Sequence, residues 1–219
     1  MNVLSRRKFL RLGLTGSAAC ITLAGNSAVS SLLPFTPAEV EGPFYPFIPQ
    51  EDRDEDLTQI KGHHTTAGGE PIYVTGQVTN QQGAPLANAN VEIWQANAKG
   101  RYRHPRDPNP APIDNHFQGW AIVKTNEQGL FRFKTIKPGA YPASAQWIRP
   151  PHIHFKILKE HYQELITQMY FPDQELNTTD LLLNRKSPTE RSAMIAKNAG
   201  QQGNWVIYEY NVILDLLHQ

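Results

Sequence analysis

Cysteine is nearly absent from this chain of 219 residues, because Cys20 is the only one. It lies within the first 30 residues, so a chain that loses this segment has no disulfide, no thiolate metal site and no cysteine nucleophile. The sequence also lacks an excess of one charge, since its formal net charge is only +1. Without a cluster of basic residues, we expect no binding of nucleic acid.

The N-terminus lacks the run of about 20 apolar residues that a membrane span needs. It carries the sequence SRRKFL from Ser5, followed by a modestly apolar stretch diluted by Gly, Ser and Thr. This pattern is typical of a twin-arginine signal peptide, with a basic membrane anchor as the alternative. We expect residues 1–30 to be the signal and residues 31–219 to form one domain. The mature part would be periplasmic or secreted, without stable membrane insertion.

Strand-like alternation begins at residue 71 and predicts the fold. Apolar residues occupy every second position of residues 71–79, and residues 89–95 return after a turn with the sequence NQQG. The pattern recurs in three further segments: residues 120–125, 130–135 and 205–214. Short strands joined by such turns predict an all-β protein, an antiparallel β-sandwich with long loops and one or two short helices.

The C-terminal third contains one helix signal and two further tyrosines. Ser187 is followed by Pro188 and Glu190, which predicts a helix start within residues 187–199. Tyr208 and Tyr210 lie on one face of the last predicted strand, and we assign both to the core.

Two histidines in the sequence RPPHIHF form the first half of a candidate metal site. In a strand, residues two apart face the same side, so His152 and His154 converge while Ile153 and Phe155 face the core. Imidazole suits Zn, Cu, Fe and Ni, so the pair does not identify the ion. The alternative is an edge strand with two solvated histidines. Arg149 lies three residues before His152, so its positive charge is well placed to bind an anionic substrate beside the metal.

Two tyrosines and a glutamine complete the pattern. Tyr102 follows a glycine turn, and Tyr141 lies between Gly139 and Pro142, where turn residues can hold a side chain at the end of a strand. Gln168 is the one amide in the strand-like run LITQMYF.

With these motifs in order, the chain resembles the intradiol ring-cleaving dioxygenases, most closely the iron-bearing protocatechuate 3,4-dioxygenase beta subunits. The resemblance runs from EGPFYP to about Phe171 and includes RYRHP in the loop after residue 101. It implies non-haem Fe(III) held by four ligands. These are Tyr102 (equatorial), Tyr141 (axial), His152 (axial) and His154 (equatorial). Residues 31–219 would then be a single catalytic domain.

The resemblance also implies the reaction. A small aromatic diol, protocatechuate-like, would react with O₂ so that both oxygen atoms enter the product. The ring would open between the two hydroxyl-bearing carbons, giving a cis,cis-muconate-type dicarboxylate. Tyr141 would take up a proton from the diol, Arg149 would stabilise developing charge, and Gln168 would hold the substrate.

The chain departs from the protocatechuate enzymes around the expected pocket. Ala143 stands where those enzymes have Trp, and the segment from Tyr141 to His152 is shorter. The substrate is therefore left open between protocatechuate, catechol, hydroxyquinol and a larger aryl diol. The resemblance also implies either a homo-oligomer or a metal-free partner subunit.

Other interpretations remain open at this point. An exported β-sandwich could bind iron or catecholates without catalysis, and a zinc hydrolase would need a third His or a carboxylate near His152. His104 and His116 are spare candidate ligands in the proline-rich loop, although hydrogen bonding within the loop is the favoured interpretation. Tyr45 either lines the pocket or anchors the N-terminal arm.

Overall fold

The computed structural model describes residues 32–48, 50 and 52–217. The predicted signal peptide, residues 1–30, lies outside this part. Within the described part, no helix has both the length and the apolar character to cross a membrane.

The first sheet is built around the ten-residue strand β1 (Pro71–Asn80). One edge of β1 pairs antiparallel with β4 (Leu130–Ile136). The other edge pairs in parallel with two successive strands, β10 (Trp205–Glu209) and β11 (Val212–Leu214). The segment predicted as one last strand is therefore interrupted, and Tyr210 lies at the break with its N–H donating to Thr75 O at 2.8 Å. Tyr208 and Tyr210 are buried, as expected.

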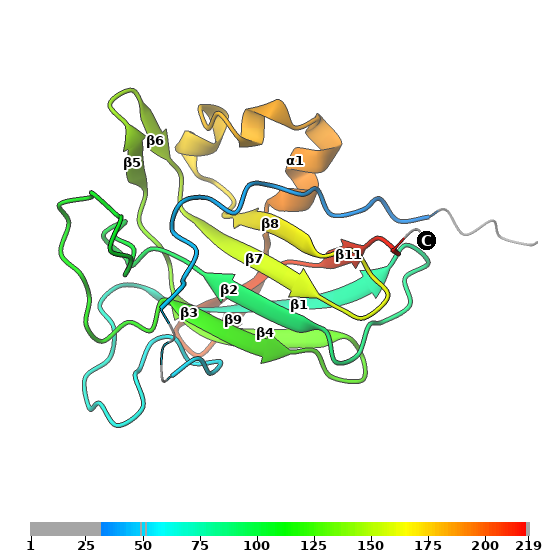
Figure 1. The fold of residues 1–219 in the computed structure, drawn as a ribbon, viewed down its shortest axis with the longest axis horizontal. Helices are drawn as coiled ribbons and strands as arrows, with labels where there is room; N and C mark the ends of the chain where they lie inside the picture. Colours follow the sequence, from blue (N-terminus) through cyan, green and yellow to red (C-terminus); the bar gives the residue numbers. More distant parts are fainter. Residues whose placement is uncertain (1–31, 49, 51, 218–219) are drawn as a thin grey trace, which may run out of the picture. The chain divides into compact units, whose positions relative to one another are not determined.

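The second sheet is antiparallel, with the order β3-β2-β7-β8. Its strands are β3 (Trp120–Lys124), β2 (Asn90–Trp94), β7 (His152–Leu158) and β8 (Leu165–Tyr170). The two sheets form the layers of the predicted sandwich (Figure 1), and one apolar core joins them. In this core the ring of Phe155 on β7 lies 6.0 Å from the rings of Phe131 and Phe133 on β4.

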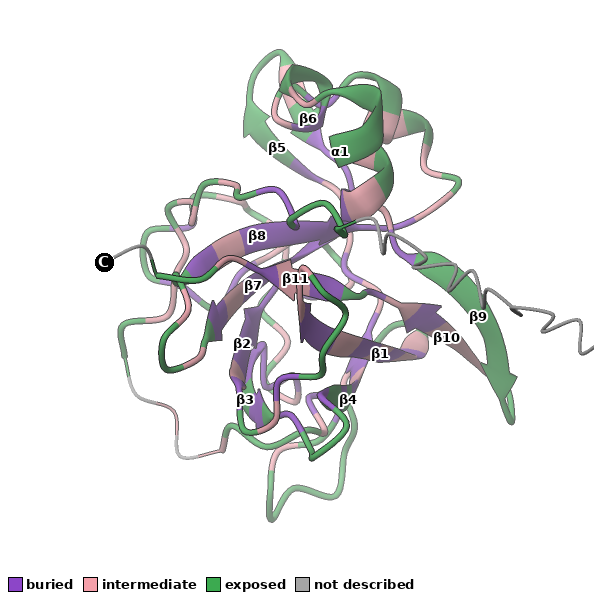
Figure 2. Cartoon of the chain, turned by 90° about the vertical axis from the view of Figure 1, so that its right-hand side faces the viewer, coloured by how far each residue is buried: buried purple, intermediate pink, exposed green. Residues whose placement is uncertain are grey.

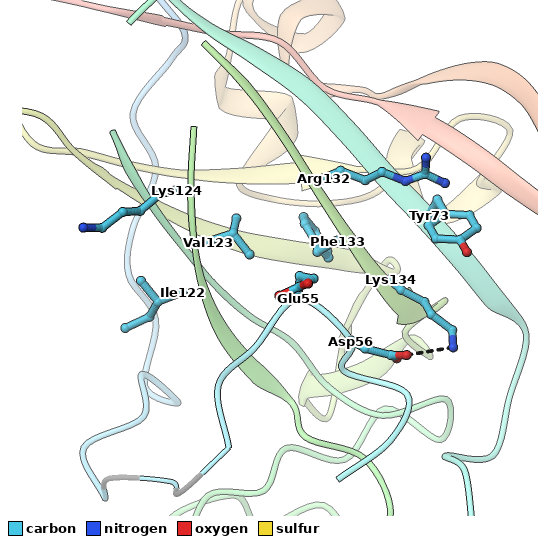
Figure 3. Close-up of a pocket in the computed structure, with 9 residues that line it drawn as sticks. All are labelled: Glu55, Asp56, Tyr73, Ile122, Val123, Lys124, Arg132, Phe133 and Lys134. Atoms are coloured by element: carbon cyan, nitrogen blue, oxygen red, sulfur yellow. Dashed lines mark hydrogen bonds and ion pairs between the residues drawn. The ribbon is translucent and has the colours of Figure 1, made fainter. Parts of the chain in front are cut away.

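A short segment closes part of the gap between the edges of the two sheets. Residues 53–57 donate and accept backbone hydrogen bonds with Ile122 on β3 and Lys134 on β4. Beside this segment lies a shallow hollow, where Lys134 Nζ pairs with Asp56 Oδ2 at 2.8 Å (Figure 3).

A separate hairpin projects from the body of the domain (Figure 1). It consists of β5 (Tyr141–Ser144) and β6 (Trp147–Arg149), which pair only with each other within the described chain. Its tip is exposed to solvent, as Figure 2 shows, while Tyr141 and Arg149 at its base are buried and paired in register. Both candidate site residues are thus held at the point where the hairpin meets the domain.

The helical region follows β8. It contains two 3₁₀ turns, η1 (Glu175–Thr178) and η2 (Leu183–Arg185), and the helix α1 (Pro188–Met194). The predicted helix start is confirmed, because Ser187 and Glu190 form a reciprocal capping box. The helix is shorter than the predicted segment, however. The strand β9 (Lys197–Gln202) begins three residues after it, pairs with β10 and is exposed along its whole length (Figure 2).

Candidate metal centre and active site

Strand β7 places the two histidines as the alternation predicted. His152 and His154 are buried on one face, and Ile153 and Phe155 lie in the core on the other. The imidazole of His154 stacks on the indole of Trp94 in the neighbouring strand β2, with ring centroids 4.8 Å apart and planes within 10°. His152 is fixed differently, because its Nδ1 lies 2.7 Å from Pro150 O. A carbonyl only accepts, so Nδ1 carries the proton and Nε2 keeps a free lone pair.

Two glycine turns pack against each other and bring the two tyrosines together. Gly100 has φ of 75°, and a Cβ on it would collide with the backbone of Ala140. A Cβ on Gly139 would lie 2.6 Å from Gly100 N. The N–H of Gly139 donates to Asn97 O at 2.9 Å, which joins the two turns. Only glycine permits this approach, and Tyr102 and Tyr141 extend from it into the same cluster.

Four donor atoms converge in this cluster. Tyr102 Oη lies 3.1 Å from His154 Nε2 and 3.5 Å from His152 Nε2, and Tyr141 Oη lies 3.5 Å from the same His152 nitrogen. Nitrogen and oxygen ligands bind a metal such as zinc at about 2.0–2.2 Å, so two ligands about 90–120° apart on one ion lie about 2.8–3.8 Å from each other. The three separations, which together link all four residues, are compatible with ligands that share a single ion.

Burial sets the protonation of these groups. Desolvation lowers the pKa of His154 to about 3 and that of His152 well below its usual range, with Arg149 adding to both effects. Both imidazoles are therefore neutral at pH 7 and able to act as ligands. Desolvation also raises the pKa of Tyr102 and Tyr141, and Arg149 opposes this rise. A bound cation is the kind of charge that can deprotonate such phenols.

Arg149 lies in a buried network next to the cluster. Its Nε donates to Asp180 Oδ2 at 2.7 Å, and its Nη2 donates to Gln168 Oε1 at 2.6 Å and to the hydroxyl of Tyr170 at 2.9 Å. The amide of Gln168 also donates to Val40 O at 2.9 Å. Gln168 thus contacts Arg149 directly, and its predicted role in holding the substrate stays a prediction.

The N-terminal arm packs against the cluster through the EGPFYP segment. The ring of Phe44 lies 4.8 Å from that of Tyr102 and 6.3 Å from that of Tyr141. Gly42 has φ of 76°, and a Cβ on it would lie 3.3 Å from His154 Cε1. The hydroxyl of Tyr45 donates to Glu92 Oε1 at 3.0 Å, which supports the anchoring interpretation of this residue.

The spare histidines do not join the cluster. His104 Nδ1 accepts from Arg106 N at 3.2 Å, a hydrogen bond within the loop. His116 lies beside His63, with ring centroids 6.0 Å apart. In the described part of the chain, no three His, Cys, Asp or Glu side chains gather as a metal site would require. The third His or carboxylate needed for a zinc hydrolase is thus not found among those residues.

Comparison with known proteins identifies the family. A family model described as Dioxygenase matches residues 40–216. The chain is 36% identical over 197 residues to a protocatechuate 3,4-dioxygenase beta chain of Burkholderia cepacia, a match that covers 79% of this chain and 83% of the relative. The chain belongs to the intradiol ring-cleaving dioxygenases. It is therefore an enzyme of aromatic-diol oxidation, as its motifs predicted.

Two further similarities place the chain within this family. It is 29% identical over 187 residues to a protocatechuate 3,4-dioxygenase alpha chain of Burkholderia cepacia, covering 81% of this chain and 90% of the relative. The crystal structure of a 3-chlorocatechol 1,2-dioxygenase from Rhodococcus opacus 1CP superposes with a TM-score of 0.65 at 26% identity. That match covers 83% of this chain and 73% of the other. The predicted sandwich fold is thereby confirmed.

Two residues near the site were not identified from the sequence. Asp180 lies in an irregular segment without periodicity or a motif, so no sequence signal singled it out. Phe44 stands next to Tyr45 in EGPFYP, and the sequence does not tell which of the two rings reaches the cluster.

Proposed function

We propose that this enzyme holds Fe(III) with Tyr102, Tyr141, His152 and His154 and cleaves a catechol-type diol. The observation that carries the proposal is the convergence of two phenol oxygens and two neutral imidazole nitrogens in one buried cluster, linked by three oxygen–nitrogen separations of 3.1–3.5 Å. Two phenolates would supply negative charge, which favours the harder ferric ion over the ferrous one. Iron bound there would chelate the diol and draw electron density from its ring, so that the ring can react with O₂.

The side chains contribute proton transfer and charge. As a phenolate, Tyr141 Oη can take a proton from a diol hydroxyl and become a neutral phenol, since free phenols have a pKa near 10. Arg149, buried beside the cluster, supplies a fixed positive charge for the oxygens of the bound diol. Aimed donors of this kind typically contribute about 2.7–4 kcal/mol to the stability of a transition state. The product would be a cis,cis-muconate-type dicarboxylate that retains both atoms of O₂.

The similar proteins indicate a class of substrate and a class of partner. We favour a protocatechuate-like diol because the protocatechuate 3,4-dioxygenase beta chain is 36% identical to this chain over 79% of its length. Assembly as a homo-oligomer or with a metal-free alpha-type subunit is consistent with the similarity to both chains of that enzyme. Export to the periplasm by residues 1–30 completes the proposal.

A visible spectrum of the purified mature protein tests the proposal. It is recorded as isolated, then with protocatechuate under nitrogen, and then after air is admitted. We expect a tyrosinate-to-iron charge-transfer band that shifts with the diol and returns after oxygen, because the product leaves. A shifted band that never recovers would favour binding without catalysis. Absence of the band, with zinc found by elemental analysis, would refute the iron assignment.

A further inference from the structure

The hairpin that carries Tyr141 and Arg149 has little support from the sheets. Within the described chain, β5 and β6 pair with each other and with neither large sheet. At its base, the Tyr141 side is fixed by the contact between the two glycine turns. The Arg149 side is fixed by the buried ion pair with Asp180, whose N–O distance is 2.7 Å. This ion pair ties the hairpin to the segment that follows β8.

Asp180 is itself held firmly. It is fully buried, and its Oδ1 accepts hydrogen bonds from the backbone N–H groups of Leu182 and Leu183, at 3.2 and 2.9 Å. The hydroxyl of Tyr170 lies 3.2 Å from the same oxygen. Leu183 and Tyr170 belong to a small apolar cluster with Met194 of α1. A carboxylate fixed in this way can define the position of the guanidinium that it binds.

The hydrogen bonds of Arg149 leave one part of the guanidinium for a ligand. The N–H of Nε is bonded to Asp180, and the two N–H groups of Nη2 face Gln168 and Tyr170. No described residue accepts a hydrogen bond from Nη1. The indole of Trp147 lies 5.2 Å from the guanidinium carbon and covers it from one side. Rotation of the guanidinium would break all of these contacts together.

We infer that Asp180 is a positioning residue of this enzyme, which aims the Nη1 donors of Arg149 at the oxygens of the bound diol. The inference rests on the proposed function and adds a residue to it. Asp180 does not touch the substrate; it acts through Arg149. Misplacement of a catalytic group by about 1 Å can cost about 100-fold in rate. We therefore expect Asp180→Asn to lower kcat/KM by about 10–100-fold, with iron content and the visible band of the resting enzyme unchanged.

A double-mutant cycle tests this inference. Asp180→Asn, Arg149→Ala and the double variant are compared with the wild type in kcat, KM and iron content. If Asp180 acts through Arg149, the double variant will be no slower than Arg149→Ala alone, within about threefold. A further 10-fold or larger loss in the double variant would overturn the inference, as would loss of iron from Asp180→Asn.

Two controls separate positioning from stability. Asp56→Asn removes a different ion pair, that with Lys134 in the hollow between β3 and β4 (Figure 3), and should leave kcat/KM unchanged even if the melting temperature falls. If Asp180→Asn does not fold, Asp180→Glu enters the same cycle. This variant keeps the carboxylate but moves it by one methylene group, and we expect a loss of about 2–10-fold that disappears in the Arg149→Ala background. An equal loss in both backgrounds would contradict the inference.

The outcomes also separate this inference from the proposed function. An iron-loaded wild type that turns over no diol would refute the proposed function and the inference with it. A wild type that turns over the diol, with Asp180→Asn equally fast, would refute the role of Asp180 alone.

Discussion

Tyr141 has two roles in the proposed site, as a ligand and as a proton acceptor, and one substitution addresses both. Tyr141→Phe keeps the aromatic ring but removes Oη, which lies 3.5 Å from His152 Nε2. Three ligands remain, so we expect some iron to be retained, whereas turnover falls by about 100–10,000-fold because a general base is lost. Tyr208→Phe, in the core, is the matched control and should retain both iron and activity. Full activity in Tyr141→Phe would refute the role of this residue as a base.

Gly100 shows how one position without a side chain determines the ligand geometry. Gly100→Ala places a Cβ against the backbone of Ala140 in addition to the strain of a positive φ. Gly203→Ala is a suitable control, because Gly203 has φ of 62° and a Cβ added there would meet no other atom within 4 Å. We expect the control to lose about 1–2 kcal/mol of stability from strain alone and to keep its iron, whereas Gly100→Ala loses more stability and binds less iron. Equal iron content in the two variants, measured by elemental analysis, would contradict this explanation.

At the scale of elements, the strands with alternating apolar residues could be predicted from the sequence. Alternation identified β1, β2, β3 and β4 and the convergence of the histidines on β7, because one face of each strand is buried in the core. It did not identify β9, whose residues are all exposed and which forms through pairing with β10. The sequence also did not predict that β10 and β11 pair in parallel with β1, since pairing partners depend on tertiary contacts.

The capping box of α1 gives an element-scale prediction about pH. Hydrogen bonds from Ser187 lower the pKa of Glu190 below its usual value. A lowered folded-state pKa means that this stabilisation is complete above the unfolded pKa, near 4.3, and is lost as the pH falls through the folded-state value. We expect Glu190→Gln to lower the melting temperature slightly at pH 7 and to leave it unchanged at pH 2–3. A difference that persists unchanged at low pH would show that the carboxylate charge is not the cause.

At the scale of the whole molecule, the burial of the ligands bears on how the enzyme acquires iron. Tyr102, His152 and His154 are each at most 3% exposed, and Phe44 of the N-terminal arm packs over the cluster. We therefore expect iron to enter most readily before or during the final packing of the arm. The twin-arginine route, which we propose for residues 1–30, carries proteins that have already folded. Iron loading in the cytoplasm and export of the loaded enzyme are then compatible.

Exchange of the leader tests this link between folding, metal and export. Arg6→Lys together with Arg7→Lys should retain the protein in the cytoplasm with its iron bound, because the fold is untouched. A leader of the general secretory type in place of residues 1–30 should deliver an unfolded chain that has to find its metal outside the cytoplasm. We expect that exported protein to contain less iron per chain than the wild type, measured by elemental analysis of the periplasmic fraction. Equal iron content by both routes would show that the buried ligands can load after export, and cytoplasmic folding would then not be the reason for the twin-arginine signal.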